Sequence, residues 1–75
     1  MPFFKAAGIV GLGMLGGSLA LDMRRLALAE VIIGASRRRS TLAQARKWGV
    51  VDEVTTDISG LIGKVDFLIL ATPPS

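Results

Sequence analysis

Three glycines near the start of the chain have the spacing of a phosphate-binding loop. Gly11, Gly13 and Gly16 form the pattern G-x-G-x-x-G within the stretch GLGMLGG. In such a loop the first glycine permits a tight turn, the second lets the backbone approach a pyrophosphate, and the third allows a helix to pack closely on a strand. The N-terminus of that helix offers free N–H groups and a positive dipole end to the phosphates. The pattern predicts a dinucleotide site, to which we assign also the intervening residues Leu12, Met14 and Leu15.

The residues on either side of the glycines predict the elements that such a loop needs. Continuous apolar runs favour buried strands at residues 7–10 and 31–35, and apolar residues at spacings of three and four favour a helix at residues 14–28. The expected buried stripe of this helix is Leu15, Leu19, Met23 and Leu26. The strand–loop–helix–strand context strengthens the dinucleotide interpretation over a close-packed turn without a ligand. A triphosphate-binding loop is disfavoured, because Gly17 and Ser18 occupy the positions of its lysine and its hydroxyl residue.

The second half of the chain continues the alternation of strands and helices. Ser40 or Thr41 is expected to cap a helix that runs to about Trp48 and stops at Gly49, with Thr41 and Gln44 as a capping box. A short edge strand is expected at residues 53–55, followed by a weak helical turn broken by Gly60 and Gly63. A buried strand at residues 67–71 is expected to stop at Pro73 and Pro74.

This order of elements predicts an α/β fold with a Rossmann-like parallel sheet. Right-handed crossovers would give the strand order 3-2-1-4, as part of a doubly wound domain. The carboxyl ends of the first and last strands then form a crevice, which places the segments GLGMLGG and ATPPS at the same edge. The whole chain, residues 1–75, is interpreted as the N-terminal portion of a dinucleotide-binding domain.

Three consecutive arginines follow the second strand in the segment GASRRRS, and they bear on which dinucleotide is bound. NAD sites place an acidic residue at the end of this strand to hold the ribose 2′-hydroxyl. Here Ser36 has that position and Arg37 follows it. A hydroxyl and a guanidinium would bind a 2′-phosphate, which a carboxylate would repel. The segment therefore predicts NADP as the cofactor, with Ser36, Arg37 and then Arg38 as ligands, and a solvated basic turn as the alternative.

The composition excludes several other classes of protein. The chain has no cysteine and no histidine, which removes disulfides, Cys/His zinc sites and histidine general bases. The net charge of +3 allows an anionic partner, but one tryptophan and three phenylalanines offer too few stacking aromatics for a nucleic-acid surface. The uncharged run at residues 6–21 is too short and too rich in glycine for a membrane span. We expect neither a nucleic acid nor a membrane as partner, and a reducing, cytoplasmic location.

Taken together, three stretches resemble a known family. GIVGLGMLGGSLAL, GASRRRSTLAQARKWGVVDEVTTD and FLILATPPS are similar to the N-terminal part of prephenate and arogenate dehydrogenases, the NAD(P)-dependent oxidoreductases of tyrosine biosynthesis. The resemblance implies that Gly17 cradles the pyrophosphate together with the three loop glycines. It also implies that the end of the last strand, Ala71, Thr72 and Pro73, lines the crevice near the nicotinamide-side ribose.

The same resemblance implies hydride transfer to the nicotinamide with loss of CO₂ from prephenate or arogenate. The catalytic histidine, the substrate-binding arginine and the helical dimerisation domain of the family lie in later sequence, so the 75 residues alone are expected to be inactive. With 51% apolar residues, the chain is expected to self-associate or to pair with the missing domain. The alternatives are another NADP-dependent β-hydroxyacid or imine reductase, and a non-catalytic nucleotide-binding module that recruits a partner through an exposed apolar sheet edge.

Overall fold

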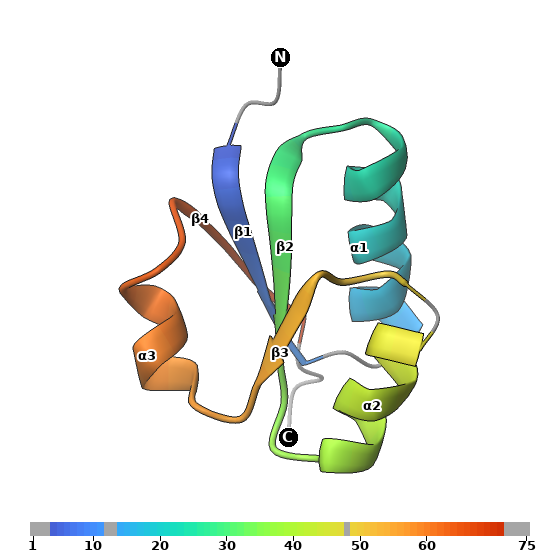
Figure 1. Cartoon of the computed structure of the whole chain (residues 1–75), viewed down its shortest axis with the longest axis vertical. Helices are drawn as coiled ribbons and strands as arrows, with labels where there is room; N and C mark the ends of the chain where they lie inside the picture. Colours follow the sequence, from blue (N-terminus) through green and yellow to red (C-terminus); the bar gives the residue numbers. More distant parts are fainter. Residues whose placement is uncertain (1–3, 12–13, 48, 72–75) are drawn as a thin grey trace.

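The computed structural model describes residues 4–11, 14–47 and 49–71, which form one parallel sheet with helices on both faces (Figure 1). The sheet has the order β3-β2-β1-β4, and every neighbouring pair is parallel. This is the Rossmann-like arrangement and strand order predicted from the sequence. The elements in chain order are β1 (Phe4–Val10), α1 (Met14–Arg25), β2 (Ala29–Ala35), α2 (Arg39–Lys47), β3 (Glu53–Thr55), α3 (Ile58–Ile62) and β4 (Phe67–Leu70).

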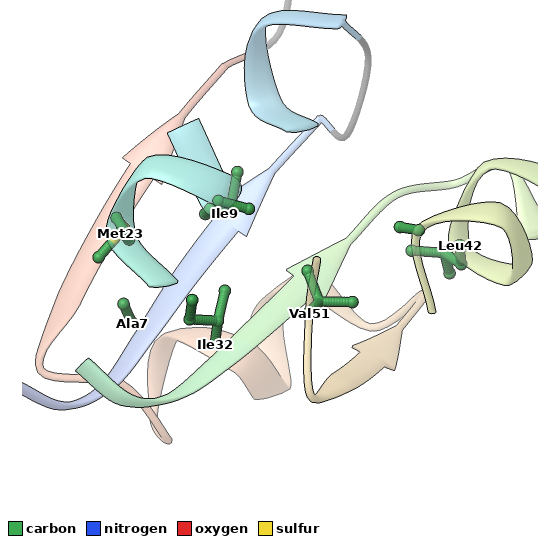
Figure 2. Close-up of a cluster of buried hydrophobic side chains, with 8 residues drawn as sticks. Ala7, Ile9, Met23, Ile32, Leu42 and Val51 are labelled. Atoms are coloured by element: carbon green, nitrogen blue, oxygen red, sulfur yellow. The ribbon is translucent and has the colours of Figure 1, made fainter. Parts of the chain in front are cut away.

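Two apolar clusters lie on opposite faces of the sheet because side chains alternate along each strand. On the face covered by α1 and α2, Ile9 and Ile32 pack with Met23, Leu42 and Val51 (Figure 2). On the face covered by α3, Leu61 packs against the other set of strand residues: Val10, Ile33 and Ala35. The central strands are therefore buried on both faces, which explains why their sequences are apolar without alternation.

The structure corrects the predicted extent of α1. This helix ends at Arg25 instead of Leu28, and Leu26 is 68% exposed and lies outside the buried stripe. Ala20 takes a core position with no exposed surface. The helix ends early because Ala27 has a left-handed φ of 52°, and the Ala27 and Leu28 amides donate to the carbonyl oxygens of Arg24 and Met23. This pair of bonds is a Schellman C-cap.

The helix α2 ends in the same motif, but with a glycine at the left-handed position. Gly49 has a φ of 73° and donates to Arg46 O, and Val50 donates to Ala45 O. The predicted stop at Gly49 is thus confirmed, whereas Trp48 lies outside the described residues. The capping box of Thr41 and Gln44 is wrong, because α2 already begins at Arg39. Arg38 O accepts the first helical bond, from the Leu42 amide, which makes Arg38 the N-cap residue.

The two C-caps make opposite predictions for stability. A residue with a Cβ costs about 1–2 kcal/mol in the left-handed conformation, so Gly49→Ala should lower the free energy of unfolding by about 1 kcal/mol. Ala27→Gly removes that cost but adds chain entropy to the unfolded state, and should raise the free energy of unfolding by about 0.5 kcal/mol. Urea denaturation of both variants checks the signs. Equal effects of the two substitutions would contradict the assignment of the caps.

Of the two glycines expected to break α3, only Gly63 ends the helix. Gly60 lies inside α3, and the N-cap residue Asp57 accepts a hydrogen bond from the Gly60 amide at 3.0 Å. A Cβ at Gly60 would lie 2.5 Å from the Asp57 carboxylate oxygen Oδ2, so a side chain here would require the carboxylate to move. Gly63 is the C-cap residue, as expected for a stop signal.

Two aspartates fix the start of the edge strands. Asp52 precedes β3; its amide donates to Ile32 O at 2.8 Å and its carboxylate accepts from the Ile32 amide at 2.8 Å. Asp66 precedes β4 and makes the same pair of bonds with Ala6, at 3.1 and 2.9 Å. Arg24 on α1 adds an ion pair to Asp52 at 3.0 Å. Both carboxylates therefore hold an edge strand in register with its neighbour.

These contacts predict a loss of stability in acid. Partial burial opposes ionisation of Asp52, but the Ile32 amide and Arg24 outweigh it and lower its pKa below the usual 3.8. The Ala6 and Lys5 amides likewise lower the pKa of Asp66. Because both folded-state pKa values lie below the unfolded value, the stabilisation is complete above pH 3.8 and is lost as the pH falls through the folded values. Urea midpoints between pH 6 and pH 2.5 should fall less for Asp52→Asn than for the unmodified chain; an equal fall would contradict this role.

Candidate functional site

The carboxyl edge of the sheet brings three predicted site segments together. The first residues after β1, β2 and β4 still hydrogen-bond to the neighbouring strand through their backbone amides. Gly11 donates to Ala35 O at 2.9 Å, and Ala71 donates to Val10 O at 2.8 Å. Ala35 directly precedes Ser36, and Val10 directly precedes Gly11. Ala71, Gly11 and Ser36 thus form one row across the edge, although up to 60 positions separate them in the sequence.

The first residue of the glycine loop has the backbone that the sequence predicted. Gly11 has a φ of 86°, a left-handed value that disfavours a residue with a side chain, and it turns the chain from β1 toward α1. Met14, Leu15 and Gly16 form the first turn of α1, so that the helix N-terminus points to the edge. Leu12 and Gly13 lie outside the described residues, and so do Thr72 and Pro73.

Gly17 has no evident structural reason to be glycine. It lies inside α1, its φ is not positive, and, apart from its chain neighbours and the backbone of its own helix, no described atom lies within 4 Å of a Cβ built there. Glycine costs a helix about 1 kcal/mol relative to alanine. Gly8 differs, because a Cβ at Gly8 would lie 3.1 Å from Leu61 Cδ2. Gly8 is thus tightly packed against Leu61, whereas the described residues leave the space beside Gly17 open.

The arginine segment lies at the same edge, between β2 and α2. The Ser36 hydroxyl accepts a hydrogen bond from the Arg38 amide at 3.1 Å and so shapes the turn that leads into α2. Its own hydrogen remains available for donation. The side chains of Arg37, Arg38 and Arg39 are exposed. Within residues 4–11, 14–47 and 49–71, the only ion pair is Arg24–Asp52, so none of these three arginines has a carboxylate partner there.

The position of these arginines is electrostatically unfavourable for the fold itself. The N-terminus of a helix carries a partial positive charge, and α2 has no acidic residue in its first turn. A cation near a helix N-terminus typically destabilises the helix by about 0.3–1 kcal/mol. Arg38 and Arg39 occupy the N-cap and the first position of α2, where a bound anion would relieve the repulsion. The local charge is suited to a phosphate.

The structure adds one polar residue to this edge that the sequence patterns did not single out. The Ser36 backbone amide donates to Thr55 O at 3.2 Å, so the row continues to the peptide that joins Thr55 and Thr56. The glycine and arginine patterns could not identify Thr56, because its relevance depends on the pairing of β2 with β3. The available signal is its place directly after a short strand.

Other kinds of site are not seen in the described part of the chain. Its His, Cys, Asp and Glu side chains form no group of three or more that could hold a metal ion. None of its helices has the length and apolar character required to cross a bilayer. The dinucleotide site predicted from the sequence thus has no competing metal centre among these residues.

The chain was compared with known families and with solved structures. No family model matches the sequence. Among solved structures, the chain is similar to prephenate dehydrogenase from A. aeolicus, a crystal structure in complex with hydroxyphenyl propionate and NAD⁺. The sequences are 33% identical, the TM-score is 0.84, and the match covers 92% of this chain. It covers 24% of the other chain, so the present chain spans about a quarter of the length of the protein it matches.

Proposed function

We infer that the chain belongs with the prephenate dehydrogenases, because it is similar to one of them in both sequence and fold, as its motifs predicted. From this premise we propose that it is the dinucleotide-binding part of a prephenate or arogenate dehydrogenase-like oxidoreductase, with NADP as its cofactor. The observation that carries the proposal is the row Ala71, Gly11 and Ser36 at the carboxyl edge of the sheet. Parallel α/β sheets bind their ligands at this edge, where the strand order reverses between β1 and β4.

The residues at this edge fit a dinucleotide in shape and charge. The left-handed turn at Gly11 and the N-terminus of α1 would hold the pyrophosphate, and the free space beside Gly17 admits it. Ser36 and Arg37 would hold the adenosine ribose, and Ala71 would lie below the nicotinamide half. When bound, the cofactor supplies the nicotinamide ring that accepts a hydride.

The choice of NADP over NAD depends on the end of β2. The similar A. aeolicus protein was crystallised with NAD⁺, so this preference is a property we propose for the present chain alone. Ser36 and Arg37 lack the carboxylate that would repel a 2′-phosphate, and the three neighbouring arginines have no acidic partner within the described residues. These features support NADP.

The substrate reaction needs groups that these residues do not supply. The chain has no histidine, whereas the family resemblance implies a histidine for the acid–base step. We therefore propose that the chain binds the cofactor and that oxidation of prephenate or arogenate requires further residues.

Calorimetric titration of the folded chain with NADP⁺ and with NAD⁺ tests this function. We expect saturable binding of both dinucleotides and tighter binding of NADP⁺. A folded chain that binds neither would contradict the proposal, and a preference for NAD⁺ would contradict the assignment of NADP.

A second candidate function, a module that associates through its sheet edge, is supported by β4. Its outer edge has no partner strand in the described chain, and Leu70 and Phe67 are 71% and 38% exposed. Exposed apolar edge strands pair readily with other chains. Leu70→Lys should therefore shift the chain toward the monomer in sedimentation equilibrium, without lowering its melting temperature. A monomeric parent chain at micromolar concentration would contradict self-association.

A further inference from the structure

Within the segment GVVDEVTTD, Thr56 is a polar residue to which the contacts of the fold give no role. The structure explains most of this segment: Gly49 and Val50 form the α2 C-cap, Val51 is buried, and Asp52 holds β3 in register. At its end, the Thr55 hydroxyl accepts from the Asp57 amide, and Asp57 caps α3. Thr56 lies between these two residues. Its side chain is exposed, and its hydroxyl has no hydrogen-bond partner among the described residues.

The pairing of β2 with β3 places Thr56 next to Ser36. In this parallel pair Gly34 is opposite Val54 and Ala35 is opposite Thr55, so the next pair is Ser36 and Thr56. The hydrogen bond from the Ser36 amide to Thr55 O continues the pairing to this point. Neighbouring strands lie about 4.8 Å apart. The Ser36 and Thr56 backbones are therefore adjacent at the carboxyl edge.

We infer the side of both residues by extending the alternation of side chains one residue beyond the ends of β2 and β3, which puts them on the face of α1 and α2. Val54 packs against the cluster on that face, so Thr56, two residues later, follows it to the same side. Ala35 packs on the α3 face, so Ser36 lies on the opposite side, with Thr56. Ala71 also packs against the cluster of the α1 and α2 face. Thr55, by contrast, lines a hollow beside α3 with Ile33 and Leu61.

We propose that Thr56 is a specificity-determining residue that donates its hydroxyl hydrogen bond to the 2′-phosphate of the dinucleotide, beside Ser36 and Arg37. This inference rests on the proposed function, because it extends the same phosphate site to a third strand. Two hydroxyls on neighbouring strands can donate to two different oxygens of one phosphate, while Arg37 supplies the charge. NAD⁺ has only a hydroxyl in place of this phosphate, so loss of the phosphate contact weakens the binding of NADP⁺ far more than that of NAD⁺.

The test is a titration of Thr56→Val, which keeps the size and branching of threonine and removes the hydroxyl. A hydrogen bond to a charged group is stronger than one between neutral groups, so we expect NADP⁺ to bind at least about tenfold more weakly. Binding of NAD⁺ should change less than about twofold. Adenosine 2′,5′-bisphosphate should lose the same factor as NADP⁺, and adenosine 5′-monophosphate should not. Thr56→Ser retains the hydroxyl and should bind NADP⁺ like the parent chain; Ser59→Ala, which removes an exposed hydroxyl on α3, is the control for a general effect.

The outcomes separate this inference from the proposed function. If Arg37→Ala loses the preference for NADP⁺ but Thr56→Val retains it, the role of Thr56 is overturned and the proposed function stands. An equal loss for both dinucleotides with Thr56→Val also overturns the role in specificity. If the folded parent chain binds neither dinucleotide, the proposed function fails and this inference fails with it. Should Thr56→Val not fold, Thr56→Ala is measured in its place.

Discussion

Arg37→Ala should remove most of the preference of the chain for NADP⁺ over NAD⁺. We expect NADP⁺ to bind at least tenfold more weakly, which corresponds to about 1.4 kcal/mol, and NAD⁺ to bind almost unchanged. The reason is that the planar guanidinium can donate two charge-assisted hydrogen bonds to a 2′-phosphate, a group that NAD⁺ lacks. Arg37 is exposed and has no ion-pair partner in the described structure, so its removal should alter the free energy of unfolding by no more than about 0.5 kcal/mol.

Arg46→Ala is the matched control for this substitution. Arg46 is also an exposed arginine of the β2–α2 region, but it lies in the last turn of α2 and so at the other end of that helix. The substitution Arg46→Ala changes the net charge by the same amount, and it should weaken the binding of NADP⁺ only slightly. If Arg37→Ala and Arg46→Ala weaken NADP⁺ equally, the arginines act through general charge and not through a phosphate contact.

Gly17→Ala should abolish most dinucleotide binding without destabilising the fold. An alanine at this position of α1 meets no described atom within 4 Å and improves the helix propensity, so the free energy of unfolding should stay equal or rise by up to about 1 kcal/mol. The added methyl group would occupy the space through which the pyrophosphate approaches the helix N-terminus. We expect both NADP⁺ and NAD⁺ to bind at least about tenfold more weakly, a loss of about 1.4 kcal/mol.

Gly8→Ala also replaces a glycine by alanine, but it should lower the stability of the chain and leave its affinity for NADP⁺ unchanged. The new Cβ would lie 3.1 Å from Cδ2 of the buried Leu61 side chain, which has little room to move. Overpacking of this kind costs about 1–3 kcal/mol, measurable as a lower urea midpoint. The affinity of the remaining folded chain for NADP⁺ should be unchanged. If the Gly17→Ala variant is less stable than the parent chain but binds NADP⁺ normally, Gly17 serves the fold. Its proposed contact with the pyrophosphate would then be wrong.

The sequence predicts the sheet well because its strongest signals are local. The apolar runs that become β1, β2 and β4 are continuous, and a parallel sheet buried on both faces requires such runs. Gly49 stopped α2 as expected, because glycine is the residue that most readily adopts the left-handed cap. The same cap is formed by Ala27, whose sequence gives no such signal, and the end of α1 was therefore placed three residues too late.

The parts that the sequence could not predict depend on contacts between distant residues. The register contacts of Asp52 and Asp66 join positions 20 and 60 residues apart, and only the repeated Val-Asp before each edge strand hints at them. The N-terminus of α2 was misplaced because the Ser36 hydroxyl and Arg38, and not Ser40 or Thr41, form the turn before it. Gly60 was wrongly predicted to break the helix. Its small size instead lets the Asp57 carboxylate approach its amide and cap α3.

The residues of the candidate site also fall into two groups, those predicted from the sequence and those recognised only in the structure. The glycine and arginine patterns predicted Gly11, Ser36 and Arg37, and the family resemblance implied Gly17; all four remain predictions of cofactor contact. The structure places Gly11 and Ser36 in one row with Ala71. Thr56 enters only through the pairing of β2 with β3, which the spacing of motifs cannot reveal. Leu12, Gly13, Thr72 and Pro73 lie outside the described residues, so their contacts also stay predictions.

The most direct test of the account is to map dinucleotide binding by amide resonances of the ¹⁵N-labelled chain. Addition of NADP⁺ should shift the amides of Gly11, Gly17 and Arg37, which lie at or beside the carboxyl edge. The amides of Asp52 and Asp66, at the amino ends of β3 and β4, should not move. Shifts concentrated at Asp52 and Asp66, or none in a chain that gives a folded spectrum, would contradict a dinucleotide site at the carboxyl edge.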